Sequence, residues 1–90
     1  MLWDENKRQQ NLQKHGLDFV DAALLFAGDW IEHEDTRYNY GEQRWIALGT
    51  IRGRVCLCVY TWRQGQRRII SLRKGNSCEQ AAYYQVFPKP

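Results

Sequence analysis

The first third of the chain has the residue pattern of two helices. Near the start of residues 3–16 lies Asp4, a residue typical of helix N-caps, and the stretch ends with Gly16, which suits the position after a helix. Leu12 is the only aliphatic side chain in this polar stretch. The predicted helix therefore depends on tertiary contacts for its stability.

A second helix is predicted over residues 18–26, with Asp18 as its cap and Gly28 as its end. Its apolar positions recur with helical spacing, so one face is suited to a core. The residues that share this face are Phe19, Ala22, Ala23 and Phe26.

After Gly28 the hydrophobic period shortens and β-prone residues dominate. Residues 29–43 predict an edge strand followed by a turn at Asn39–Gly41. Three further strands are predicted over 44–50, 54–62 and 67–74, joined by turns at 51–53 and 63–66. A last helix is predicted over 77–87, with Ser77 as its cap.

This order of elements predicts an α+β fold in a single domain over residues 1–90. Two N-terminal helices precede an antiparallel sheet of three to four strands, and a C-terminal helix follows. Because consecutive strands are linked by hairpins, we expect an antiparallel sheet with the helices on one face.

The last strand, "RRIISLRKG", mixes aliphatic and basic side chains. Strict alternation would place Arg67, Ile69, Ser71 and Arg73 on one face, and the intervening residues on the other. Each face is then apolar in its middle and cationic at its ends. We expect the strand to be central, with its guanidinium groups gathered at an edge of the sheet.

The charge is distributed unevenly along the chain. The net charge is +3, but residues 1–45 carry −4 and residues 46–90 carry +7. This asymmetry favours an anionic partner for the second half. Alternatively, the two halves neutralise each other within one fold.

Other features narrow the class of protein. No apolar run is long enough for a membrane helix, and the N-terminal residues lack a signal-peptide pattern, so we expect a cytoplasmic protein without a membrane partner. The three cysteines, Cys56, Cys58 and Cys78, are interpreted as reduced packing thiols. No phosphate-binding loop, nucleophile motif or metal motif is present, so no cofactor and no metal is expected.

The candidate chemistry rests on basic side chains with a few acids and histidines. Arginine binds phosphate with two hydrogen bonds and stays charged, and a cluster of six cations is interpreted as an anion-binding surface. Its members are Arg44, Arg63, Arg67, Arg68, Arg73 and Lys74. His15, Glu42 and Glu79 are candidates for proton transfer, with a helix cap as the alternative for His15 and a salt bridge as the alternative for Glu42. His33 is interpreted as a solvated edge residue.

The segments "WDENKRQQNLQKHGLDF", "YGEQR", "CVYTWR" and "RRIISLRKG", followed by a glutamate and a tyrosine pair, occur in the order found in a known family. Together they resemble the BrnT toxins of bacterial type II toxin–antitoxin systems. The resemblance implies a fold like the RelE ribonucleases and metal-independent RNA cleavage that inhibits translation. It also implies a BrnA-like ribbon-helix-helix antitoxin as partner, with operator DNA bound only through that antitoxin.

Carried onto this chain, the resemblance implies Lys14, His15, Glu42, Arg44, Arg63, Arg68, Ser71 and Arg73 as site residues, and the interpretation of the residue types adds Arg67, Lys74 and Tyr83. The catalytic candidates are Lys14, His15, Glu42, Arg63, Arg68 and Arg73, and the RNA-binding candidates are Arg44, Arg67, Ser71, Lys74 and Tyr83. We expect Glu42 or His15 as the base, the three arginines as phosphate clamps, and Lys14 or Tyr83 as the acid. The alternative is a binding module that pairs with an antitoxin and co-represses its promoter without cleaving RNA.

Overall fold

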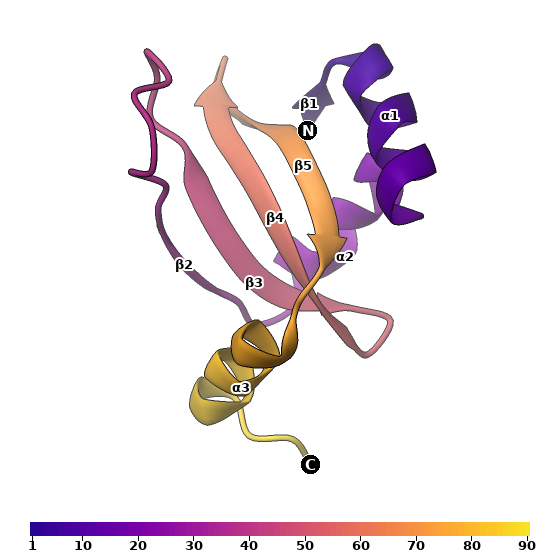
Figure 1. The fold of residues 1–90 in the computed structure, drawn as a ribbon, viewed down its shortest axis with the longest axis vertical. Helices are drawn as coiled ribbons and strands as arrows, with labels where there is room; N and C mark the ends of the chain where they lie inside the picture. The colour runs from indigo at the N-terminus through magenta and orange to yellow at the C-terminus, as the bar shows by residue number, and fades with distance from the viewer.

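The computed structural model describes residues 1–90 as an α+β fold, which confirms the predicted class. The elements are β1 (Leu2–Trp3), α1 (Glu5–His15), the 3₁₀ turn η1 (Phe19–Asp21), α2 (Ala22–Ala27), β2 (Ile31–Glu34), β3 (Trp45–Ile51), β4 (Arg54–Arg63), β5 (Gln66–Lys74) and α3 (Ser77–Val86). Figure 1 shows a twisted sheet with α1 beside one edge, α2 behind it and α3 across one end. None of the helices combines the length and apolar character that crossing a membrane requires.

The sheet has five strands in the order β1-β5-β4-β3-β2 and is mixed, not purely antiparallel. The antiparallel ladders of β2 to β5 agree with the prediction, but β1 adds a parallel partner to β5 through Leu2↔Arg68 and Trp3↔Ile69. The expected count of three to four strands was therefore too low. A strand of two residues is too short to display a period, so the sequence pattern could not reveal it.

The helix ends follow the predicted residues in most cases. The Asp4 carboxylate accepts a hydrogen bond from the backbone N–H of Lys7 at 3.1 Å, and Gly16 ends α1 with φ of 70°. The second helix differs from its prediction, because residues 19–21 form a 3₁₀ turn capped by Asp18 before the six-residue α2.

The cap of α3 is Asn76, and the prediction of Ser77 was wrong. The Asn76 side chain accepts from the backbone N–H of Glu79 at 2.9 Å, and the Glu79 carboxylate accepts from the backbone N–H of Asn76 at 2.8 Å. This reciprocal capping box requires a glutamate three residues after the cap, which places the cap at position 76.

The helices cover both faces of the sheet, whereas one face was expected. On one face, Phe19, Ala22 and Leu25 are fully buried against the sheet. On the other face, Tyr83 of α3 packs on a smaller cluster that includes Leu48 and Val55. Because α3 covers only one end of its face, the rest of that face stays open (Figure 1).

A β-bulge in β5 changes which side chains reach this open face. Val59 pairs with Ser71 and Tyr60 pairs with Ile69, so Ile70 is an extra residue without a partner. Strict alternation was therefore wrong for the second half of β5. The open face carries Arg68, Ile70, Ser71 and Arg73. The opposite face, called the helix-covered face because η1 and α2 pack on it, carries Arg67, Ile69, Leu72 and Lys74.

The predicted hairpin turns are confirmed by their backbone angles. Arg52 and Gly53 have φ of 50° and 79°, and Gln64 and Gly65 have φ of 55° and 72°. Two consecutive residues with positive φ are characteristic of tight hairpins whose twist matches that of the strands. The cysteines are all free thiols, as expected, with Cys56 and Cys58 buried and Cys78 exposed.

Gly49, in the middle of β3, provides a test of this packing. A Cβ atom at this position would lie 2.7 Å from Cγ of Leu25, which is fully buried. We expect Gly49→Ala to lower the free energy of unfolding by about 2 kcal/mol, because α2 must shift away from the sheet. Urea unfolding would measure the effect, with Gly28→Ala as the control because a Cβ at Gly28 has no neighbour within 4 Å.

Candidate active site

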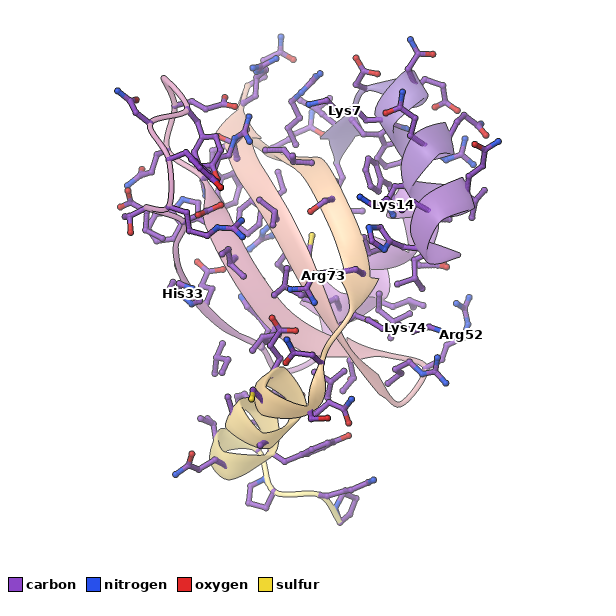
Figure 2. All side chains as sticks on the ribbon, viewed as in Figure 1. Lys7, Lys14, His33, Arg52, Arg73 and Lys74 are labelled. Atoms are coloured by element: carbon purple, nitrogen blue, oxygen red, sulfur yellow. The ribbon has the colours of Figure 1, made fainter.

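A cavity of about 430 Å³ lies on the open face of the sheet. Its floor is apolar and consists of Ile46, Leu57 and Val59 from β3 and β4. Its polar lining comes from α1, β2, the loop after β2, β5 and α3, and comprises Lys14, His15, His33, Arg37, Ser71, Arg73 and Glu79. In Figure 2 Arg73 lies over the middle of the sheet, with His33 on one side and Lys14 on the other.

The position of Lys14 and His15 depends on Asn11, which is buried with only 7% of its surface exposed. The Asn11 amide donates to the carbonyl oxygens of Leu72 at 2.8 Å and Leu17 at 3.0 Å, and its oxygen accepts from the Leu72 N–H at 3.1 Å. The side chain thus pairs with the edge of β5 as a neighbouring strand would. Lys14 and His15 follow Asn11 by three and four residues, so they lie on the same side of the helix.

Arg73 is brought to the cavity by the bulge and is held there by Glu79. The guanidinium donates to both carboxylate oxygens of Glu79, at 2.8 and 2.9 Å. The hydrogen bonds from Arg73 lower the pKa of Glu79, although partial burial opposes the shift. Since Glu79 also caps α3, it is a weak proton acceptor whose role is to position Arg73.

Arg37 is held at the mouth of the cavity by Asp35. The Asp35 side chain is 1% exposed, and its two oxygens accept from Arg37 at 2.9 Å each, whereas the Arg37 side chain is 62% exposed. The Tyr40 hydroxyl donates to the same carboxylate at 3.0 Å. Hydrogen bonds from Arg37 hold the pKa of Asp35 well below its usual value, against the effect of burial. Asp35 therefore stays charged and orders the loop that carries Arg37.

A second cluster of charged side chains lies outside the cavity, at the C-terminal end of β4. Glu42 pairs with Arg44 at 3.2 Å and with Arg63 at 3.6 Å, and the Arg44 guanidinium lies 4.1 Å from the Tyr40 ring centre. The structure thus brings Glu42, Arg44 and Arg63 together, but separates them from Lys14 and His15.

Two of the expected RNA-binding side chains are already engaged within the fold. Arg67 lies on the helix-covered face among aromatic rings, with its guanidinium carbon 4.0 Å from the centre of Phe26 and 4.8 Å from that of Trp62. Its buried Nε atom has no hydrogen-bond partner. Tyr83 is buried, and its hydroxyl donates to the carbonyl oxygen of Asp29 at 2.9 Å.

The remaining candidates divide between the two faces. Ser71 lines the cavity, and Arg68 lies on the same face outside it. Lys74 is exposed on the opposite side of β5 and lines other cavities.

Sequence reasoning missed His33 and Arg37 as members of this cavity. A signal for His33 existed, because Ile31 and His33 are two residues apart on β2 and share the face on which Ile31 packs. Arg37 lies in a loop without periodicity, so only its contact with Asp35 places it.

The comparisons with known proteins identify a family for this chain. No curated protein has a sequence that matches this chain. A family model described as "Ribonuclease toxin, BrnT, of type II toxin-antitoxin system" matches residues 3–79, which include every polar residue that lines the cavity. The chain therefore belongs to the BrnT family, the ribonuclease toxins of type II toxin–antitoxin systems.

Proposed function

We propose that this chain is itself an active endoribonuclease that cleaves RNA without a metal ion and thereby inhibits translation. The carrying observation is that His15 and His33 meet Arg73 in one cavity on the open face, with Lys14 and Arg37 beside them. Two groups able to transfer protons together with several cations are the parts that RNA transesterification needs.

The reaction begins at the substrate's own 2′-hydroxyl. His15 removes its proton, and the 2′-oxygen attacks the adjacent phosphorus. His33 protonates the 5′-oxygen that leaves, so the products are a 2′,3′-cyclic phosphate and a free 5′-hydroxyl. The two histidines come from α1 and β2, on different walls of the cavity, as an in-line displacement requires.

The cations and the serine act on the phosphate. Negative charge develops on its oxygens in the transition state, and Arg73 offers two N–H groups in a planar fork. Lys14 and Arg37 add positive charge at the mouth of the cavity, and the Ser71 hydroxyl is a further hydrogen-bond donor. Glu42, which was considered as the base, is paired with two arginines outside the cavity, and Tyr83, considered as the acid, is buried.

The other cations of the open face would guide the RNA strand. Arg68, Arg63 and Arg44 lie toward the far end of β4 and β5, where phosphates flanking the cleaved bond would pass. We keep these residues as proposed RNA contacts, not as catalytic groups.

Family membership implies an antitoxin partner. We propose that this partner is a BrnA-like protein with a ribbon-helix-helix domain and that operator DNA is bound only through it. We further propose that residues 1–90 act as a single toxin domain in the cytoplasm and that the fold is related to the RelE ribonucleases. The order of two helical segments, an antiparallel meander and a final helix supports that relationship.

The proposal is tested by incubating the purified chain with a labelled RNA oligonucleotide in excess EDTA. We expect cleavage with 2′,3′-cyclic phosphate ends, at a rate that chelation changes by less than about twofold. An oligonucleotide with 2′-deoxyribose throughout should stay intact, because it lacks the nucleophile. Binding of RNA without cleavage would instead favour the non-catalytic binding module, and loss of cleavage in EDTA would contradict metal independence.

A further inference from the structure

A second polar cavity, of about 450 Å³, lies where the β3–β4 hairpin meets the start of α3. Three cations line it, Arg54, Lys74 and Lys89, and no carboxylate does. None of the three takes part in an ion pair within the chain. Arg52, on the same hairpin, differs because it pairs with Asp21 at 3.2 Å.

The backbone fixes the closeness of Arg54 and Lys74. Lys74 pairs with Cys56 across the β4–β5 ladder, so Arg54, two residues before Cys56, is its diagonal neighbour on the same face. The N–H of Gly75 donates to the carbonyl oxygen of Val55 at 2.9 Å and holds the two segments together. A Cβ at Gly75 would lie 3.3 Å from that oxygen, so the approach is suited to glycine.

Two neighbouring cations without an acid repel each other, and an anion between them would remove this cost. Their effect on the surroundings is visible at Cys56, where burial raises the pKa of the thiol and the charges of Arg54 and Lys74 act against it. Gln80 and Tyr84 complete the lining, and the Lys89 ammonium lies 5.4 Å from the centre of the Tyr84 ring.

The cavity is also close to the candidate active site along the chain. Arg73 and Lys74 are consecutive residues of β5 whose side chains lie on opposite faces. An RNA strand that passes over the end of β5 would therefore contact both side chains. Figure 2 shows Arg73 over the sheet and Lys74 on the side of the β3–β4 hairpin.

We propose that this second cavity binds a backbone phosphate of the RNA that flanks the phosphate at Arg73, with Arg54 and Lys74 as its direct ligands. This inference rests on the proposed ribonuclease function. Lys89 adds charge, and the Tyr84 ring offers a surface on which the attached base stacks. The mostly polar lining favours RNA over an acidic protein segment, because a protein segment would need an apolar pocket for its anchoring side chains.

The test measures binding of the full chain to a 2′-O-methyl RNA oligonucleotide, which cannot be cleaved, by fluorescence anisotropy at several KCl concentrations. We expect R54Q/K74Q to bind about tenfold more weakly and to reduce the slope of log Kd against log salt by about 0.7, because one phosphate contact is lost. R52Q is the matched control, since it removes one cation from the same hairpin but none from the cavity, and its slope should equal that of the wild type.

A charge-conserving variant, R54K/K74R, separates loss of a contact from loss of folding, and it should keep the wild-type slope. An unchanged slope in R54Q/K74Q would overturn the inference. If the wild type still cleaves RNA in that case, the proposed ribonuclease function is retained without the second phosphate site. Weaker binding of the antitoxin by R54Q/K74Q with unchanged RNA binding would overturn it as well, in favour of a protein interface. If the wild type binds no RNA and cleaves none, both proposals are wrong.

Discussion

Replacing Arg73 with alanine is expected to lower the rate of RNA cleavage by about 100-fold or more, equivalent to about 3 kcal/mol of lost transition-state stabilisation. The reason is that Arg73 is the guanidinium over the apolar floor of the cavity, where it is placed to bind the phosphate oxygens that gain charge in the transition state. The measurement is the initial rate on a labelled oligonucleotide, together with growth after induced expression. Growth arrest should occur with the wild type and not with Arg73→Ala.

The fold of Arg73→Ala should remain intact. Glu79 loses its ion pair, but its carboxylate still accepts from the Asn76 N–H and caps α3. The Arg73 side chain is 36% exposed, so we expect the free energy of unfolding to fall by no more than about 1 kcal/mol. Arg73→Lys keeps the charge without the planar fork, and its rate should lie between those of wild type and alanine variant.

The variant Arg63→Ala tests where on the sheet the catalytic centre lies. The resemblance to known toxins makes Arg63 a phosphate clamp, whereas the structure places it with Glu42 at the other end of β4. A folded Arg73→Ala variant that cleaves almost as fast as wild type, combined with a large loss in Arg63→Ala, would move the catalytic centre to that end.

Asn11→Ala is expected to have the largest effect on stability, about 3 kcal/mol. The substitution removes three hydrogen bonds and leaves the N–H and carbonyl of Leu72 and the carbonyl of Leu17 without their partners. Unpaired polar groups at a buried site cost about 1–3 kcal/mol each before water enters. Chemical denaturation followed by circular dichroism would measure the change.

Gln10→Ala is the matched control for Asn11, because Gln10 is the preceding residue of α1 and is exposed. Its free energy of unfolding should stay within about 0.5 kcal/mol of that of the wild type. An Asn11→Ala variant as stable as Gln10→Ala would show that α1 is held in place by other contacts, of which the Arg8–Asp18 pair at 2.8 Å is the strongest alternative.

Much of the fold could be predicted from the sequence because local rules and burial agree there. The helix beginning at Asp4, the two tight turns at Gly53 and Gly65 and the long strand β4 are all places where residue type determines backbone conformation. At the start of α3, both Asn76 and Ser77 are residue types that cap helices. The capping box with Glu79 selects Asn76.

The candidate site could be predicted only in part, because its members meet through long-range geometry. Lys14, His15 and Arg73 were identified by residue type, but their proximity depends on the side chain of Asn11 and on the bulge at Ile70. Neither feature has a periodic signature. Without the bulge, the alternation rule assigns Arg73 and Lys74 to the wrong faces, and the two cavities that they line would be confused.

The pairing of Asn11 with β5 also bears on aggregation. An open sheet exposes two edges whose backbone groups invite strands from other molecules. Here β1 covers Arg68 and Ile69, and Asn11 occupies both hydrogen-bonding groups of Leu72, so one edge offers no continuous ladder. The other edge, β2, has only four residues and carries Glu32 and Glu34. Both edges thus discourage pairing with strands of other molecules. We therefore expect little aggregation of the chain when its partner is absent.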